Sequence, residues 1–306
     1  MKDLIIGAIT KYKYEQIEPW VNSIEKSGFD GHKALIVYDI DVETANKLVA
    51  KGFRLFGFER DATGNFTYPA KENFSIMVER FIHAWYFITQ IEDPIRNVIW
   101  TDVKDVIFQR NPSEWFDENF TFGTRRHIIV GSENFRYKDE PWNKNNMTLS
   151  FGPLMYDRMK NEPVFCAGVI AGNKDFIVDL FKEVFLMCRG CPAEIPGGGG
   201  PDQAALNIIL SLKPYEQIVE FSSTDDDWVA HLGTSMPAIL SGSGGIGEEY
   251  MRNPASLNTF KKAMLDNDPV MIDGVIRNHS GQPYVIVHQY DRVKDWKPVI
   301  EKKYRG

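Results

Sequence analysis

Two aspartates lie three positions apart between two apolar runs, and this spacing suits the binding of a divalent cation. Asp102 and Asp105 follow the strand-like residues 97–100 and precede the apolar residues 106–108. A chain that turns here places both carboxylates at the edge of a sheet. Mg2+ and Mn2+ prefer oxygen ligands, and one or two carboxylates together with substrate phosphates complete their coordination. The alternative is a solvated turn in which an aspartate caps the next segment, but the flanking apolar runs favour the metal site.

Helix and strand patterns alternate before this turn, and the alternation determines where the two acids lie. Helices are predicted at residues 14–27, 42–51 and 74–91, and strands at residues 4–9, 34–38, 53–58 and 97–100. Such alternation predicts an α/β fold with a mixed, mostly parallel central sheet flanked by helices. Ligands bind beyond the carboxyl ends of the strands in sheets of this kind. The acidic turn lies at that edge.

The second half of the chain has a less regular pattern. Strands are predicted at residues 164–170 and 285–287, and helices at residues 175–187 and 201–212. The polar residues 135–150 are expected to form a mobile loop. Because no repeat and no change of composition marks a linker, we expect a single domain over residues 1–306. Its nucleotide-binding half is expected at residues 1–110 and its acceptor half at residues 111–306.

Composition excludes several classes of partner. The formal net charge of −7 argues against nucleic acid as the main partner, although a bound cation would still allow a phosphate ligand. Three cysteines cannot form a disulfide framework, which fits a reducing compartment. The first residues run directly into a strand pattern, so we expect no signal peptide. No apolar stretch reaches the roughly 18 residues that span a bilayer, so we expect a cytoplasmic location.

The acidic turn resembles the metal-binding motif of a known enzyme family. Residues 101–109, TDVKDVIFQ, are similar to the D-x-D motif of glycosyltransferases with the GT-A fold, including a subset encoded by large algal viruses. The spacing departs from that motif, because the acids here form D-x-x-D. With the apolar runs aligned, Asp105 takes the second acid position and Val103 the first. The resemblance therefore implies that Asp105 binds Mn2+ or Mg2+ and that Asp102 contacts ribose or a metal-bound water.

A late histidine fits the same family. His288 ends the apolar run 284–287, and many GT-A enzymes carry a histidine at a late strand end that binds the metal. A neutral imidazole is a suitable ligand for Mn2+. The alternative is a histidine that only makes hydrogen bonds at a strand terminus. Together with the acidic turn, the ligand role is the preferred interpretation.

Residues 200–207, GPDQAALN, resemble the segment that carries a catalytic or sugar-binding acid in this fold. The resemblance makes Asp202 a candidate catalytic base and Gln203 a candidate donor contact. An inverting transfer needs a base that deprotonates the acceptor hydroxyl near the anomeric carbon. A purely structural role stays open, because Pro201 and Asp202 also suit the start of a helix.

Further contacts to the donor are implied by the same resemblance. Residues 163–172 resemble the strand that lines the donor sugar, where the small residues Ala167 and Gly168 let the sugar approach the backbone. Their alternative role is in a tightly packed core strand. Glu133 is a further plausible sugar contact.

The start of the chain is similar to the region that holds the nucleotide. The resemblance implies that Thr10 and Tyr12, at the end of the first strand, contact uracil and ribose. Asp39, which ends the next strand, is expected to do likewise. Arg80 lies on an otherwise apolar helix, where it reaches the diphosphate or pairs with an acid, and the ion pair is the preferred interpretation.

The resemblance predicts a glycosyltransferase that moves a sugar from a UDP-sugar to a hydroxyl of a glycan or glycoprotein acceptor. Inversion is the favoured stereochemistry, and retention stays open because related retaining enzymes carry an acid in a similar place. A sugar-1-phosphate nucleotidyltransferase is the second hypothesis, but the glycine-rich loop usual in such enzymes is missing at residues 10–13. The third is a carbohydrate-binding module that does not hydrolyse a donor.

Overall fold

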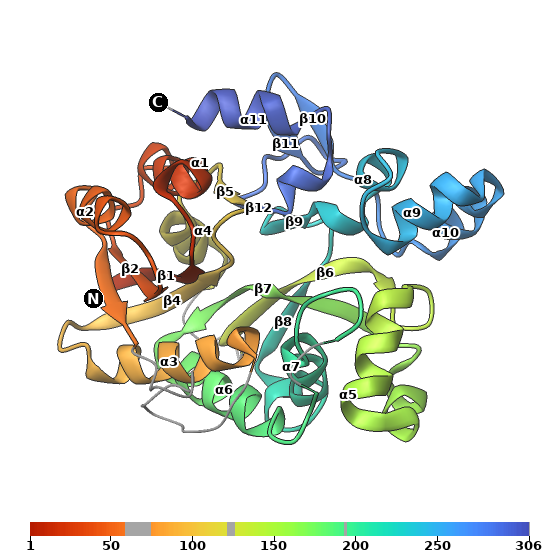
Figure 1. Cartoon of the computed structure of the whole chain (residues 1–306), viewed down its shortest axis with the longest axis horizontal. Coiled ribbons are helices and arrows are strands. Elements are labelled where there is room, and N and C mark those ends of the chain that lie inside the picture. The colour runs from red at the N-terminus through yellow and green to blue at the C-terminus, as the bar shows by residue number, and fades with distance from the viewer. Residues whose placement is uncertain (59–74, 121–125, 193–194, 306) are drawn as a thin grey trace.

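The computed structural model of the protein describes residues 1–58, 75–120, 126–192 and 195–305, and it has a central sheet with helices on both faces (Figure 1). The N-terminal part alternates strands and helices as the sequence predicts. Its elements are β1 (Lys2–Thr10), α1 (Tyr14–Lys26), β2 (His32–Tyr38), α2 (Val42–Ala50), β3 (Arg54–Gly57), α3 (Ile76–Gln90) and β4 (Ile95–Thr101).

The rest of the chain adds shorter strands and several helices. They are β5 (Val106–Phe108), α4 (Pro112–Asn119), β6 (Ile128–Arg136), α5 (Pro141–Met159), β7 (Pro163–Asn173), α6 (Lys174–Met187), α7 (Asp202–Leu210), β8 (Val219–Ser222), β9 (Val229–His231), α8 (Met236–Leu240), α9 (Gly244–Arg252), α10 (Leu257–Ala263), β10 (Val270–Ile272), β11 (Val275–Arg277), β12 (Ile286–His288) and α11 (Lys297–Tyr304). Within the described ranges, we find no helix with the length and apolar character needed to cross a membrane.

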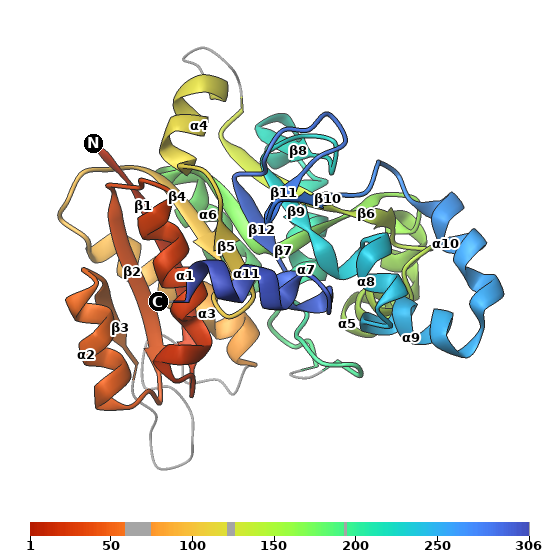
Figure 2. The same cartoon turned by 90° about the horizontal axis from the view of Figure 1, so that it is seen from above.

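The central sheet has seven strands in the order β3-β2-β1-β4-β7-β6-β8. Strand β7 runs antiparallel to both of its neighbours, β4 and β6, while the other adjacent pairs are parallel. The predicted mixed, mostly parallel α/β sheet is therefore confirmed. Seen from above, β1, β2 and β3 lie at one end of the molecule and α8, α9 and α10 at the other (Figure 2).

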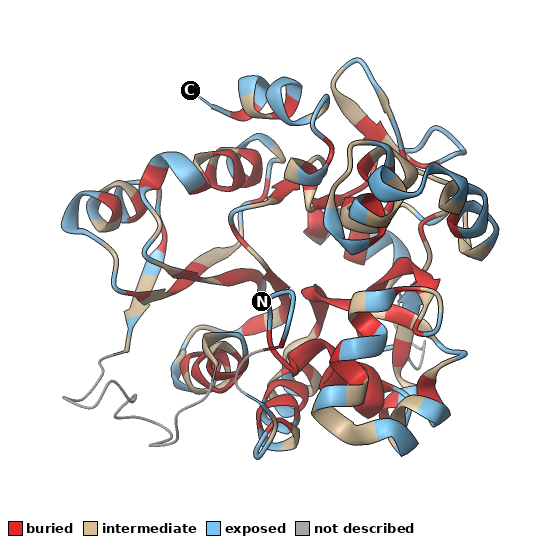
Figure 3. Ribbon diagram, turned by 45° about the vertical axis from the view of Figure 1, so that its right-hand side comes forward, coloured by how far each residue is buried: buried red, intermediate tan, exposed pale blue. Residues whose placement is uncertain are grey.

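Alternate residues of the central strands enter separate cores on the two faces of the sheet. Leu4 and Ile6 of β1 pack with α3 and α6 on one face. Ile5 and Ile9 pack with α1 and with residues of β5 and β12 on the opposite face. The central strands are accordingly buried along most of their length (Figure 3). This double covering fixes β4 rigidly and thereby positions the turn that follows it.

A second, three-stranded sheet lies beyond the end of β4, in the order β5-β12-β9. Strand β12 is antiparallel to β5 and parallel to β9. Its last residue, His288, pairs with Val106 of β5 and with His231 of β9. The small sheet therefore brings a residue from the end of the chain beside the acidic turn.

The prediction of a mobile loop at residues 135–150 is wrong. Strand β6 continues to Arg136, and α5 begins at Pro141. The carboxylate of Glu140 accepts hydrogen bonds from the backbone N–H groups of Trp142 and Asn143, so it caps this helix. The segment looks loop-like in sequence because its buried side chains include polar residues, whose hydrogen bonds lie inside the molecule. Helix α4 was also missing from the predicted elements.

Candidate functional site

Strand pairing brings Asp102, Asp105 and His288 together. Both aspartates lie in the short turn between β4 and β5, and His288 is held next to that turn by the pairing of β12 with β5. The Nε2 atom of His288 lies 3.4 Å from Oδ2 of Asp102 and 3.8 Å from Oδ1 of Asp105. Candidate ligand atoms of the three residues all lie within 4.8 Å of one another.

These three side chains fit a divalent cation. His288 is 2% exposed, and its buried Nε2 atom has no hydrogen-bond partner among the described residues, although it faces two carboxylates. Two carboxylates and an imidazole form a ligand set that suits Mn2+. A bound cation would therefore satisfy an otherwise unpaired ring nitrogen and offset the charge of the two acids.

Gly168 allows the three groups to approach one another. A Cβ atom on this residue would lie 2.4 Å from Cε1 of His288 and 2.9 Å from Oδ2 of Asp102, so one of these side chains would have to move. The carbonyl of Gly168 also accepts a 2.7 Å hydrogen bond from the backbone N–H of Asp102. The predicted small residue is thus a structural requirement of the site.

Arg80 of α3 links two acids of the site. Its guanidinium donates to Oδ1 of Asp102 and, at 3.0 Å, to Oδ2 of Asp202. The side chains of Arg80 and Asp202 are only 11% and 7% exposed, so this ion pair is shielded from solvent, whereas the side chain of Asp102 is 30% exposed. The preferred interpretation of Arg80 as an ion-pair partner agrees with this geometry.

The three acids of the site, of which Asp202 is buried and Asp102 and Asp105 are partly buried, differ in their electrostatic environment. Burial alone raises the pKa of Asp102, but Arg80 and His288 together lower that pKa well below its ordinary value. Burial raises the pKa of Asp105, an effect that His288 opposes and Asp102 reinforces. Burial also raises the pKa of Asp202, against the influence of Arg80. Arg80 and His288 thus favour the ionised form of Asp102, whereas burial disfavours the ionised forms of Asp105 and Asp202.

A cavity of about 310 Å³ extends from this cluster towards the end of β1. Thr10 and Tyr12 line it, together with Tyr38 and Met77. Asp39 is exposed and is not among the described residues that line it. Its backbone is left-handed, with φ of 52°.

A second cavity, of about 650 Å³, lies on the other side of the cluster. Ala167, Gly168, Asp202, Gln203 and Glu133 all line it. The two cavities share Met77, Arg80, Asp102, Gln289 and Arg292. The candidate metal ligands therefore lie where two adjoining cavities meet, an arrangement that places two parts of one ligand on either side of a cation.

Gln203 is held by a network of hydrogen bonds in the wall of the second cavity. Its Oε1 atom accepts from the backbone N–H of Ala167 at 3.1 Å. Its Nε2 atom donates to Glu133 at 3.2 Å and to Oδ1 of Asn143 at 2.8 Å. Asn143 in turn donates to Glu133 and to Glu140. This network fixes the side chains of Gln203 and Glu133 without a bound ligand.

Comparisons with known proteins relate this architecture to glycosyltransferases. No protein-family model and no curated protein matches the sequence. Among solved structures, the apo bifunctional glycosyltransferase WbbM superposes with a TM-score of 0.54 at 13% identity, over 98% of this chain and 49% of WbbM. An active-site mutant of LgtC gives a TM-score of 0.50 at 12% identity, over 98% of this chain and 95% of that chain.

The chain has a GT-A-like glycosyltransferase fold. A structure of the galactosyltransferase LgtC with donor and acceptor sugar analogues also aligns, with a TM-score of 0.49 at 12% identity over 99% of this chain and 96% of LgtC. The chain spans about half the length of WbbM and almost the full length of LgtC. The superpositions on WbbM and on the LgtC mutant confirm the fold class expected from the sequence.

The structure gathers most of the predicted site residues around the two cavities, and it adds residues that sequence reasoning missed. Trp142 lines the second cavity and donates from its indole nitrogen to the carbonyl of Gly198 at 3.2 Å. Gln289 lines both cavities. Trp142 was missed because its segment was expected to be a loop. The position of Gln289, directly after His288, was the available signal.

We predict that Gly168→Ala weakens Mn2+ binding by about 10-fold or more, because the new methyl group would displace His288 from Asp102. The dissociation constant of Mn2+ is measured by calorimetry, and circular dichroism checks the fold. Gly245→Ala is the matched control, since a Cβ there meets no atom within 4 Å. Equal Mn2+ affinity in Gly168→Ala and wild type would contradict the assigned geometry.

Proposed function

We propose that the protein is a metal-dependent glycosyltransferase that transfers a sugar from a UDP-sugar to a hydroxyl group of a glycan or glycoprotein acceptor. The observation that carries this proposal is the meeting of Asp102, Asp105 and His288 at the junction of two cavities. The shared glycosyltransferase fold supports it.

Asp105 and His288 would hold Mn2+ or Mg2+, with Asp102 beside them. Bound there, the cation would stabilise the negative charge of the departing diphosphate. Asp102 has one oxygen directed to Arg80 and the other near His288, so it stays close to the ion position whether or not it binds directly. Arg80 keeps this carboxylate ionised and fixed in orientation.

The first cavity would bind the nucleotide. Thr10 and Tyr12 offer a hydroxyl and an aromatic ring to uracil and ribose, and the ring of Tyr12 lies 5.9 Å from the ammonium group of Lys104. Asp39 would reach the nucleotide only from the exposed rim next to Tyr38. Residues 8–105 supply most of this cavity, in agreement with a nucleotide-binding half at residues 1–110.

The second cavity would bind the transferred sugar and the acceptor. Ala167 and Gly168 present backbone with little side chain, and Gln203 is fixed beside them. Most of the remaining lining residues lie between residues 133 and 248, within the proposed acceptor half. A single domain with two cooperating halves is consistent with cavities that adjoin.

Asp202 would act as the base of an inverting transfer. It lines the second cavity, it is 5% exposed, and burial raises its pKa, which makes the carboxylate a better proton acceptor near neutral pH. Arg80 holds one carboxylate oxygen, which would leave the other for the acceptor hydroxyl.

We predict that UDP binds much more weakly in the absence of Mn2+ than in its presence. We also predict that Asp105→Ala abolishes hydrolysis of UDP-sugars, because the diphosphate loses the cation that balances its charge. Calorimetry measures UDP binding, and UDP release from a panel of UDP-sugars measures hydrolysis. Asp157→Ala, an exposed acid on α5, is the matched control. Tight UDP binding without metal, or an active Asp105→Ala variant, would contradict the proposal.

Pyrophosphate released from UTP and a sugar phosphate would instead favour a nucleotidyltransferase.

The product should carry the inverted anomeric configuration, and Asp202→Asn should lower kcat by a factor of about 10² to 10⁴ through loss of the base. Proton NMR of the fresh product gives the anomeric configuration, and initial rates give kcat. A product with retained configuration would refute the role of Asp202 as base while leaving the transferase assignment intact.

A further inference from the structure

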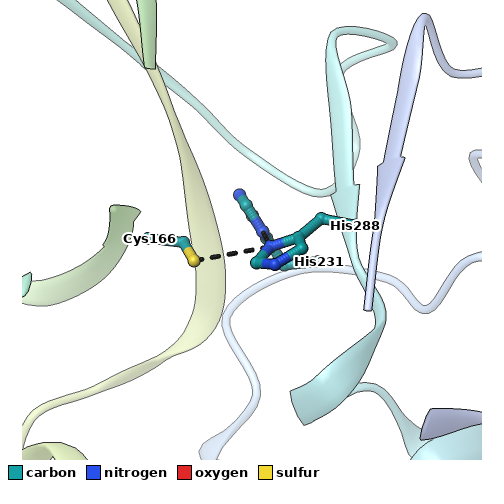
Figure 4. A group of neighbouring side chains, drawn as sticks. All are labelled: Cys166, His231 and His288. Atoms are coloured by element: carbon teal, nitrogen blue, oxygen red, sulfur yellow. Dashed lines mark hydrogen bonds between the residues drawn. The ribbon is translucent and has the colours of Figure 1, made fainter. Parts of the chain in front are cut away.

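A second histidine contacts the candidate metal ligand from the side opposite the carboxylates. The Nδ1 atom of His231 lies 2.9 Å from the Nδ1 atom of His288 (Figure 4). The two rings are nearly perpendicular, at 84°. Both residues are buried, with exposures of 3% and 2%. At this distance the two nitrogen atoms share one proton, since a hydrogen bond needs one donor and one acceptor.

The location of that proton decides whether His288 can bind a metal. A neutral imidazole carries one N–H group and one bare nitrogen, and the bare nitrogen is the ligand. If Nε2 of His288 faces a cation, the proton must lie on Nδ1. It then donates to Nδ1 of His231, whose own proton must lie on its Nε2 atom. His231 is thus the acceptor that stabilises the metal-binding tautomer.

The opposite arrangement would block the metal. If the proton of His288 lies on Nε2, it points towards Oδ2 of Asp102, 3.4 Å away, and Nε2 offers no lone pair to a cation beside the carboxylates. Without His231, the remaining hydrogen-bond neighbour of Nδ1 among the described residues is the sulfur of Cys166 at 3.5 Å, which is a weak acceptor. Removing the acceptor would therefore shift His288 towards the tautomer that does not bind metal.

The fold holds His231 in this position. It is the last residue of β9 and pairs in register with His288 across the parallel strands β9 and β12. Gly131 of β6 makes room for its ring, because a Cβ there would lie 2.7 Å from Nε2 of His231.

The group Cys166, His231 and His288 has the composition of a zinc site, but its geometry favours a supporting role. The three ligand atoms lie within 4.8 Å of one another. A cation there would take Nδ1 of His288, which leaves the ring proton on Nε2. A cation beside the carboxylates could then use Nε2 as a ligand only if the ring lost both protons. A hydrogen bond between the histidines leaves Nε2 available without that loss.

We propose that His231 is a positioning residue that accepts a hydrogen bond from the Nδ1–H group of His288. This bond fixes the tautomer of His288 in which the proton lies on Nδ1 and the bare Nε2 faces Asp102 and Asp105. It would touch neither the metal nor the substrate. The inference rests on the proposed function, because it assigns His288 as a metal ligand. Hydrogen-bond partners of metal-bound histidines typically change metal affinity by about 10- to 100-fold when removed.

The test compares His231→Leu, which removes the acceptor, with His231→Asn, whose side-chain carbonyl can replace it. We expect His231→Leu to weaken Mn2+ binding by about 10- to 100-fold and to lose the coupling between Mn2+ and a directly bound imidazole nitrogen in pulsed EPR. His231→Asn should retain the coupling and most of the affinity. His127→Asn, a histidine before β6, is the matched control and should match wild type.

A measurement on the wild-type protein does not depend on the folding of the variants. With saturating Mg2+ and UDP, nitrogen-15 NMR should show the proton of His288 on Nδ1 and that of His231 on Nε2. The reverse assignment, or unchanged Mn2+ affinity and nitrogen coupling in a folded His231→Leu variant, would overturn the inference. A thiolate absorption band with Co2+ that disappears in Cys166→Ser would also overturn it, by showing a second metal site.

If wild type bound no Mn2+ at all, the proposed function would fail. If wild type bound Mn2+ through His288 and His231→Leu bound it equally well, only the role of His231 would fail. The two failures are therefore distinguishable in the same calorimetric and EPR experiments.

Discussion

The site depends on the packing of two carboxylates against one guanidinium, with a third carboxylate close by and only partly exposed to solvent. Asp102 and Asp202 both pair with Arg80, while Asp105 lies close to Asp102 and His288 without a cation of its own among these contacts. Removing acidic groups from water is costly unless opposite charge or hydrogen bonds compensate. A divalent cation at the junction of the two cavities would add positive charge beside Asp105 and satisfy Nε2 of His288, which has no hydrogen-bond partner among the described residues.

The backbone achieves this arrangement through strand pairing over long sequence separations. Strand β4 delivers the two aspartates, β7 brings Gly168 against them, and β12 brings His288 from near the end of the chain. These contacts are short because Gly168 has no side chain and because the register of β12 with β5 sets the position of His288. Binding and chemistry thus depend on the meeting of two sheets, and a change in the pairing of β5 with β12 would move His288 away from the aspartates.

Much of the fold was predictable because its strands and helices carry clear periodic patterns. The alternation before Asp102 identified the parallel sheet and the edge at which the acids lie. The segment containing Trp142 and Asn143 was misassigned because its polar side chains are buried in a hydrogen-bond network that periodicity does not reveal. His231 gave no signal, since its role depends on the register of β9 with β12. The sequence therefore indicates which residues could bind a metal or transfer a proton, whereas the residues that contact them are set by the tertiary structure.

The most direct measurement is anomalous X-ray scattering from crystals grown with Mn2+ and UDP. We expect one Mn2+ within coordination distance, roughly 2.0–2.3 Å, of the carboxylate of Asp105 and of Nε2 of His288, between the nucleotide and the second cavity. UDP bound in the first cavity with no Mn2+ at these side chains, or with the ion elsewhere, would contradict the central role of the metal.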